Sequence, residues 1–419
     1  MKYRDALAND RGSARDVGDV LSGWLEVAER FLESHLERRP LRGSSAWGEG
    51  SDRVGLFHNL TFEDERALIE RARDWQRLKS DAGYGSISWP VECGGAGLPP
   101  AYESAFRTLE QSFVTPRIHE AVSISVDIAA GTVLALGTPE QQVRYVRPLR
   151  RADELCCQLF SEPGAGSDLG SVTTRAVLDG TEWVLDGQKV WTSGAAHADW
   201  GYVLARTDAD APRQHAMTAF IVPMHTAGVE VRPLRQMSGG ASFNEVFLAE
   251  VRVPDAARLA DVGAGWHAAM TTLGIERGTM SAASSGGGGD LFGRLVMLAR
   301  HLGLDRDPVI RQGLADVYLL GRLRSLNARR AAANLKARGG PGPEGSIGKL
   351  FTTKRAQRVA EVASQLLVQR LVVDSGEWGM FAWSEFVTGV PGLRLAGGTD
   401  EIQRNAIAER GLGLPREKR

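Results

Sequence analysis

The chain has 419 residues, 43% of them hydrophobic, which is enough for a large core and more than one domain. Its 50 basic and 51 acidic side chains leave a net charge of −1, so charge gives no argument for nucleic acid or an anionic membrane as a partner. The three cysteines (Cys93, Cys156 and Cys157) have no framework spacing, which is typical of a reducing cytoplasm. We find no apolar run of about 18 residues and no secretory signal in MKYRDALANDRGSARD, and therefore expect a cytoplasmic protein without membrane insertion.

Residues 1–158 are predicted to form an α-helical domain. Val20–Phe31 and Glu63–Leu78 place apolar residues at helical spacing between charged ones. The breaker cluster SWPVECGGAGLPP at Ser88–Pro100 separates predicted helices. Thr138-Pro139-Glu140 has the pattern of a helix start.

Residues 159–257 are predicted to form a central antiparallel β domain. Asp179-Gly180 and Asp186-Gly187 lie between short apolar segments and predict two tight turns. Pro254 ends the β pattern. The expected strands are Thr173–Leu178, Glu182–Leu185, Lys189–Thr192, Tyr202–Arg206, Thr218–Val222, Val229–Arg232 and Glu245–Val253.

Residues 258–419 return to a helical period and predict a domain that resembles a four-helix bundle. Leu319, Leu323 and Leu326 share one helix face, and the linker GGPGPEGS at Gly339–Ser346 separates two long helices. A glycine run at Gly286–Gly289 indicates a loop or a close helix contact. The fold class is therefore α+β, and the order of helices, sheet and helices argues against a doubly wound parallel sheet.

Two neighbouring stretches suggest a nucleotide site. They are CQLFSEPGAGSDLGSVTT at Cys157–Thr174 and DGQKVWTS at Asp186–Ser193. A dinucleotide fingerprint of the Rossmann type needs its glycines between a strand and a helix, but here they lead into strands. The sequence also lacks a GxxxxGK[ST] motif, so these glycines indicate a different kind of nucleotide site.

Together with GGTDEIQRNAIAER at Gly397–Arg410, WPVECGGAGL and the tail LGLPRE, these stretches resemble the acyl-CoA dehydrogenase family over nearly the whole chain. The resemblance implies an FAD flavoprotein that oxidises an acyl-CoA thioester to the trans-2-enoyl-CoA, as in fatty acid β-oxidation and other lipid metabolism. It further implies transfer of electrons to an electron-transfer flavoprotein. The implied assembly is a homotetramer, a heterotetramer of two kinds of subunit, or a dimer.

The resemblance also implies the residues that bind FAD. Trp191 would flank the flavin ring, Ser193 would lie near flavin N5, and Ser161 would bind the pyrimidine end. Thr399 and Glu401 would bind the ribose or pyrophosphate of a neighbouring subunit's FAD, although Thr399 also has the pattern of a helix N-cap. The full set is Phe160, Ser161, Gly166, Ser167, Trp191, Thr192, Ser193, Gln365, Gly398, Thr399 and Glu401.

The catalytic base is expected on the helix that follows the β domain. Many members of the family carry it in a Tyr-Glu-Gly-Thr sequence, but Gly397 stands in its place here. Other members carry it in a Leu-x-x-Glu-Arg pattern, which matches Leu273–Arg277 and makes Glu276 the base. By resemblance, the backbone N–H of Gly397 would bind the thioester carbonyl and Arg277 would hold the local backbone or a carboxylate. A plain solvated helix pair is the alternative for Glu276 and Arg277.

Other functions stay open at this point. A flavin monooxygenase or a relative of nitroalkane oxidase would use the same scaffold, and a partner subunit of a mixed tetramer would lack part of the chemistry. A helical scaffold without enzymatic activity is a further alternative. Small residues near the base (Gly274, Gly278 and Gly286–Gly289) favour a bulky acyl group. His197 is interpreted as an incidental loop residue, the basic run Arg322–Arg330 as a solvated or inter-subunit face, and no metal site is proposed.

Overall fold

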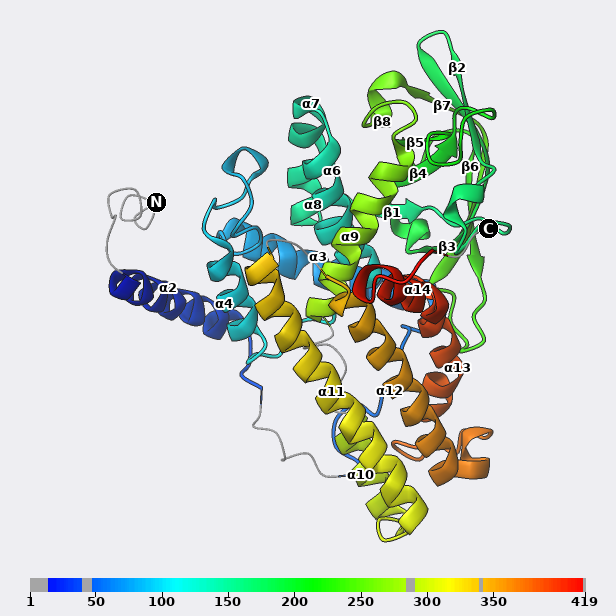
Figure 1. The fold of residues 1–419 in the computed structure, drawn as a ribbon. Coiled ribbons are helices and arrows are strands. Elements are labelled where there is room, and N and C mark those ends of the chain that lie inside the picture. The colour runs from blue at the N-terminus through cyan, green and yellow to red at the C-terminus, as the bar shows by residue number, and fades with distance from the viewer. Residues whose placement is uncertain (1–13, 40–46, 284–290, 339–341, 417–419) are drawn as a thin grey trace.

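The structure is a computed structural model that describes residues 14–39, 47–283, 291–338 and 342–416. The glycine run at 286–289 lies outside these ranges, as does Glu417 at the end of LGLPRE. Helices at both ends of the chain flank a central sheet, as the sequence predicts (Figure 1). The proposed domain limits at 158 and 257 stay a prediction, and strand β1 crosses the first of them.

The N-terminal part is helical. Its α-helices are α2 (Ala14–His35), α3 (Phe62–Asp81), α4 (Pro100–Glu110), α5 (Glu120–Ser123), α6 (Ala130–Leu136), α7 (Pro139–Gln141) and α8 (Arg147–Arg151). A π-helix at Ile124–Ala129 joins α5 to α6, so residues 120–136 form one continuous helix. A second π-helix at Gln142–Val146 joins α7 to α8.

Local sequence explains where these helices begin. The Thr61 side chain accepts a hydrogen bond from the Asp64 N–H at the start of α3. Thr138 and Gln141 form a capping box at the start of α7, with Pro139 in the first turn, and this confirms the helix start predicted there.

The central part is one eight-stranded sheet. Its strands are β1 (Cys156–Leu159), β2 (Arg175–Asp179), β3 (Glu182–Ser193), β4 (Trp200–Arg206), β5 (Met217–Pro223), β6 (Val229–Leu234), β7 (Phe243–Pro254) and β8 (Arg258–Leu259). Their order is β6-β7-β3-β2-β4-β5-β8, and β1 pairs with β4. The pairs of β4 with β1 and with β2 are parallel, and the other pairs are antiparallel.

The turn predicted at Asp186-Gly187 is wrong. Residues 182–193 form a single strand, β3, and Asp186-Gly187 lies at a register shift in its pairing with β7. A Cβ on Gly187 would lie 2.3 Å from Thr174 Oγ1, so this glycine permits a close approach of two segments instead of a chain reversal. The turn predicted at Asp179-Gly180 is confirmed, because Gly180 has φ +64° between β2 and β3.

The C-terminal part is again helical. Its helices are α9 (Gly265–Ala283), α10 (Leu291–His301), α11 (Pro308–Arg338), α12 (Glu344–Leu367), α13 (Ala382–Leu395) and α14 (Asp400–Gly411). Helix α9 lies between the sheet and the other C-terminal helices and contacts β4, β5, α6 and α12 (Figure 1). No helix within the described ranges combines the length and the hydropathy that a membrane crossing requires.

Separate apolar cores hold these parts together. One lies among α6, α8, the sheet and α9, and includes Val133, Leu204 and Ala268. Another lies among α10–α13 and buries one face of α12, with Val359, Val362, Ala363 and Leu366. Since α9 packs on the first core and on α12, its residues come to lie beside all three parts of the chain.

Candidate active site

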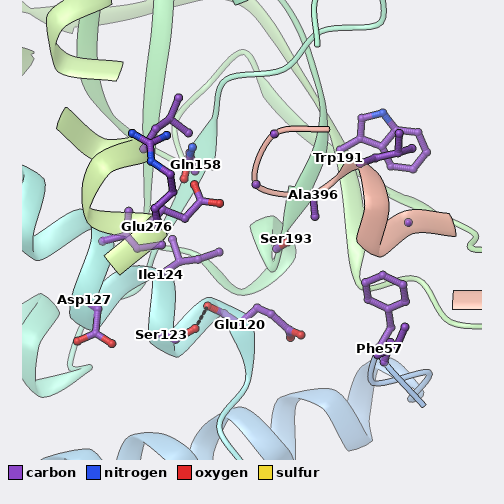
Figure 2. Close-up of a pocket in the computed structure, with 18 of the residues that line it drawn as sticks. Phe57, Glu120, Ser123, Ile124, Asp127, Gln158, Trp191, Ser193, Glu276 and Ala396 are labelled. Atoms are coloured by element: carbon purple, nitrogen blue, oxygen red, sulfur yellow. Dashed lines mark hydrogen bonds between the residues drawn. The ribbon is translucent and has the colours of Figure 1, made fainter. Parts of the chain in front are cut away.

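A cavity of about 2460 Å³ lies where the N-terminal helices, β3, α9 and the α13–α14 turn meet. Most of the predicted site residues line it. Figure 2 shows Trp191, Ser193, Glu276 and Ala396 around the same space. The residues from the predicted set that line the cavity are Phe160, Ser161, Gly166, Ser167, Trp191, Ser193, Glu276, Arg277, Gly397, Gly398 and Thr399.

The SEPGAGSD stretch forms a tight turn at the cavity wall. Glu162 and Ala165 exchange backbone hydrogen bonds of 2.9 and 3.0 Å, which closes the turn around Pro163-Gly164. A Cβ built on Gly166 would meet no atom within 4 Å. The carbonyl of Ser161 accepts a hydrogen bond from the Val190 N–H at 2.9 Å, so the turn is tied directly to β3.

A buried ion pair, which was not assigned from the sequence, joins the two motifs. Lys189 Nζ lies 2.8 Å from Glu162 Oε1, and Lys189 is completely buried. The ammonium also donates to the carbonyls of Phe160 and Leu204 at 3.1 and 2.7 Å, so all three of its N–H groups have acceptors. The occurrence of both residues inside SEPGAGSD and DGQKVWTS was a signal that could have found the pair.

The Glu162 carboxylate is equally well satisfied. It accepts hydrogen bonds from the Thr173 N–H and hydroxyl and from the Thr174 N–H, at 2.6 to 2.8 Å. Burial raises the pKa of Glu162, but Lys189 and these donors outweigh it and lower the pKa to about 2. Burial also lowers the pKa of Lys189 to about 8, against the opposing effect of Glu162.

Trp191 projects out of the sheet. The register of β3 against β7 shifts between Lys189 and Thr192, and Trp191 has φ +62° in this bulge. A left-handed conformation strains a bulky residue, and here it leaves the indole 63% exposed at the cavity. The ring makes an edge contact with Phe243, with centroids 6.1 Å apart. The indole can therefore cover a flat ligand.

The residues after Trp191 alternate between the sheet and the cavity. Thr192 is buried and does not line the cavity, and its carbonyl accepts a hydrogen bond from Asn244 Nδ2 at 3.0 Å. Ser193 lines the cavity. Gly194 follows with φ +65°, and a Cβ there would lie 2.5 Å from Ala121 Cβ. This close contact brings the start of α5 next to Ser193.

The α13–α14 turn brings Gly397 and Gly398 to the cavity, both at positive φ. A glutamate at position 397 would have to adopt φ +63°, which L side chains rarely do. The Thr399 side chain accepts a hydrogen bond from the Ile402 N–H, which confirms it as the N-cap of α14. Gln365 and Glu401 are exposed and do not line the cavity.

Glu276 is half-buried on α9 and lines the cavity (Figure 2). Burial raises its pKa above the ordinary glutamate value, although the charges of Arg277 and Lys349 oppose the rise. The pKa of Arg277 is lowered by burial and by the nearby charge of Arg410. The Glu276 carboxylate therefore takes up a proton more readily than an exposed glutamate does.

His197 is not an incidental loop residue, contrary to the interpretation from sequence. Its Nε2 lies 3.1 Å from Glu65 Oε2, and His119 Nε2 lies 2.9 Å from Glu65 Oε1. The pKa of Glu65 is lowered to about 2, because the hydrogen bonds from the two histidines outweigh the burial that would raise it. One carboxylate of α3 therefore holds the β3–β4 connection and the segment before α5.

The shape and chemistry of the cavity fit an FAD cofactor. The indole of Trp191 offers a flat apolar surface, Ser161 and Ser193 offer hydroxyl groups, and the turn at Gly166 offers open backbone. The cavity is also much larger than the ~300–1,000 Å³ of ordinary small-molecule sites, as a dinucleotide with a second ligand requires.

Comparison with protein-family models agrees with this geometry. Residues 59–153 match the N-terminal domain of acyl-CoA dehydrogenases, residues 157–251 match the middle domain, and residues 263–412 match the C-terminal domain.

Individual acyl-CoA dehydrogenases are also similar to this chain in sequence. The chain is 36% identical to acyl-CoA dehydrogenase IpdE1 of Mycobacterium tuberculosis, over 84% of this chain and 90% of that protein. It is 38% identical to acyl-CoA dehydrogenase FadE34 of the same organism over 96% of this chain, which spans 54% of FadE34.

Solved structures share the fold. A variant of the Tcur3481-Tcur3483 steroid ACAD is 27% identical with a TM-score of 0.71, over 85% of this chain and 95% of that one. The ChsE4-ChsE5 complex from Mycobacterium tuberculosis is 26% identical with a TM-score of 0.68, over 86% and 94%. The chain therefore belongs to the acyl-CoA dehydrogenase family, and it is an oxidoreductase whose cofactor is FAD.

Proposed function

We propose that this protein catalyses α,β-dehydrogenation of an acyl-CoA thioester to the trans-2-enoyl-CoA, with Glu276 as the base that removes the α-proton. The observation that carries the proposal is the position of Glu276. It is a half-buried carboxylate on the wall of the cavity that also holds Trp191 and Ser193. Its raised pKa suits a group that must accept a proton near neutral pH.

Each residue at the cavity would have a separate role in this reaction. Glu276 takes the α-proton from the thioester, and its Oε atom carries that proton until product leaves. The backbone N–H of Gly397 binds the thioester oxygen, on which negative charge develops as the proton is removed. Trp191 and Ser193 hold the flavin in place, and the apolar wall of the cavity excludes water. Bound FAD supplies the acceptor for the hydride that leaves the β-carbon.

The proposed substrate class is a bulky, steroid-like acyl-CoA. The cavity has room for one beside a dinucleotide, and the Tcur3481-Tcur3483 protein, which shares the fold, is a steroid ACAD. Electrons would pass from the reduced flavin to an electron-transfer flavoprotein, as the resemblance to the family implies. A role in the β-oxidation of straight-chain fatty acids is the alternative that a panel of substrates would separate.

The assembly proposed is a multimer in which neighbouring subunits complete each FAD site. Gln365 and Glu401 are exposed and lie outside the cavity of their own chain, so they could reach a cofactor only in another subunit. Among the structures that share the fold, ChsE4-ChsE5 is a complex. A mixed tetramer is therefore proposed beside the homotetramer, and mass measurement of the purified chain, alone and with coexpressed candidates, separates the two.

Anaerobic flavin bleaching tests the proposed reaction. The purified holoenzyme is mixed with straight-chain and steroid side-chain acyl-CoAs in the absence of oxygen, and the absorbance of the oxidised flavin is followed. We expect bleaching with a steroid-type thioester and formation of the enoyl-CoA product by mass spectrometry. A yellow protein that no acyl-CoA bleaches would contradict the proposed reaction.

A further inference from the structure

Glu120 is one of several further carboxylates that line the same cavity, and it lies at some distance from Glu276 (Figure 2). Glu120 begins the continuous helix of residues 120–136. The later part of this helix packs on α9 close to Glu276. A Cβ built on Gly131 would lie 3.4 Å from Ile275 Cδ1, and the Thr132 and Thr272 hydroxyls are hydrogen-bonded at 3.1 Å.

The helix runs along the cavity from one carboxylate towards the other. Gly131 lies eleven positions after Glu120, which at about 1.5 Å per residue is on the order of 15 Å along the helix. Gly131 faces Ile275, the residue before Glu276. A long acyl group, or one with several fused rings, that is oxidised next to Glu276 can extend along this helix towards Glu120.

His58 holds Glu120 in position. His58 Nε2 lies 3.1 Å from Glu120 Oε2, and the buried imidazole stacks on His119 with ring centroids 4.8 Å apart. Glu120 Oε2 is buried, yet the side chain as a whole is 42% exposed. Because Glu120 lines the cavity, the exposed part of its side chain is available to a ligand there.

Glu120 is ionised in this environment. Burial by itself raises the pKa of the carboxyl, but the hydrogen bond and charge of His58 and the charge of His119 outweigh burial, and the net pKa is lowered. Arg117, which also lines the cavity, adds an attractive charge. An ionised carboxylate accepts hydrogen bonds and cannot donate one.

A metal ion does not account for this cluster. His58, His119 and Glu120 lie close enough to share one. However, both ring nitrogens of His119 are already used, because Nδ1 accepts the Ala121 N–H at 3.0 Å and Nε2 lies 2.9 Å from Glu65 Oε1. The cluster is therefore a support for one carboxylate of the cavity wall. His58 pairs with Glu120 and stacks on His119, whose ring is fixed by Glu65 and the Ala121 N–H.

We propose that Glu120, positioned by His58, determines substrate specificity by accepting a hydrogen bond from a hydroxyl group at the end of the acyl moiety remote from the thioester. This inference rests on the proposed function and narrows its substrate class to hydroxylated, polycyclic acyl-CoAs. A ketone at the same position offers no proton to Glu120. A plain hydrocarbon would leave the carboxylate without a partner once water is displaced, which is unfavourable.

Matched CoA thioesters test this specificity. Cholanoyl-CoA has no ring substituent, lithocholoyl-CoA adds one hydroxyl at the ring farthest from the thioester, and the corresponding ketone replaces that hydroxyl. The kcat/KM for anaerobic flavin reduction is measured with each on the holoenzyme. We expect the hydroxylated thioester to be favoured over the other two by about 10- to 100-fold, the effect of one hydrogen bond to a charged group.

The variant Glu120→Gln should bring the ratio of hydroxyl to ketone close to one, because an amide serves either group. The kcat/KM with cholanoyl-CoA should rise, because the hydrocarbon no longer leaves a charge without a partner. The FAD content and the circular dichroism spectrum show that the variant is folded. His58→Phe keeps the ring stacking and should reduce the hydroxyl preference in part, mainly through KM. The control Glu63→Gln makes the same charge change on an exposed first turn of α3 and should keep the wild-type preference.

Two results overturn the inference while the dehydrogenation stands. One is a wild-type enzyme that oxidises the three thioesters with equal kcat/KM. The other is a Glu120→Gln variant that keeps the wild-type preference for the hydroxyl. Failure of these and all other acyl-CoAs to bleach the flavin contradicts the proposed function itself, and the inference falls with it.

Discussion

Lys189 and Glu162 form a buried ion pair that connects the two motifs at the cavity wall, with Nζ and Oε1 2.8 Å apart. Lys189 also donates to the carbonyls of Phe160 and Leu204. Glu162 accepts hydrogen bonds from the backbone N–H groups of Thr173 and Thr174. The pair therefore fixes the SEPGAGSD turn against the strand that carries Trp191.

The variant Lys189→Met should destabilise the protein by about 3–5 kcal/mol, because it leaves the Glu162 carboxylate buried without its cation. Urea unfolding followed by circular dichroism measures the change. The FAD content should fall as well, since the turn and β3 lose their connection. The double variant Lys189→Met/Glu162→Gln should recover part of the loss, since it removes both charges. If the loss of stability in the double variant equalled the sum of the losses in Lys189→Met and in Glu162→Gln, the pair would not be coupled.

The contact between Gly194 and Ala121 can be tested with a matched pair of glycine variants. Gly194 and Gly180 have φ of +65° and +64°, but a Cβ on Gly180 meets no atom within 4 Å, whereas one on Gly194 would lie 2.5 Å from Ala121 Cβ. Gly180→Ala should cost only the backbone strain of about 1–2 kcal/mol. Gly194→Ala should cost clearly more and should weaken FAD retention beside Ser193. Similar unfolding midpoints for the two variants would argue against the close contact.

Glu65 should contribute acid sensitivity to the fold. Its pKa is about 2 in the folded protein, against 4.5 for an ordinary glutamate. A lowered carboxyl pKa stabilises the folded state fully above the unfolded value, and this stabilisation is lost as the pH falls from 4.5 towards 2. The size of the contribution is about 3 kcal/mol.

The variant Glu65→Gln should therefore be less stable than the wild type at pH 7, and its stability should fall less steeply in acid. Chemical unfolding between pH 7 and pH 3 provides the comparison. If both proteins lost stability along parallel curves, the contacts of Glu65 with His119 and His197 would not set its pKa.

Arg277 should influence the pH at which kcat/KM falls on the acid side of its pH profile. A base must be ionised to accept a proton, so kcat/KM falls as the pH drops through the pKa of Glu276, which lies above the ordinary value. The Arg277 charge opposes that rise, so Arg277→Gln should move the limb to higher pH. Exposed Arg404 provides the control, and Arg404→Gln should leave the limb unchanged. An unmoved limb in Arg277→Gln would mean that another group titrates.

Local sequence patterns predicted much of the fold. The spacing of apolar residues indicated α3, and Thr138 with Pro139 indicated the start of α7, because caps and helix faces are set by neighbouring residues. Asp186-Gly187 misled the prediction, because the glycine is needed for a close contact with Thr174 of another segment and not for a turn. Other contacts between segments distant in the sequence could not be predicted either, because patterns of neighbouring residues do not report them.

The candidate site was predictable only where motifs carried it. Trp191, Ser193 and Glu276 lie in recognisable stretches, and all three line the cavity. Glu120 with His58 and Glu65 with His197 were missed, because each pair joins segments about 60 or more residues apart and neither lies in a motif. The exposure of Gln365 could not be foreseen either, since its proposed role depends on a second subunit.

The central claim is that Glu276 is the base. Anaerobic stopped-flow mixing of Glu276→Gln with an acyl-CoA that bleaches the wild-type flavin tests it most directly. We expect a yellow variant with normal FAD content and thioester binding whose flavin is not reduced, a loss of at least about 10²-fold in the reduction rate. Reduction of the variant at the wild-type rate would show that Glu276 is not the base.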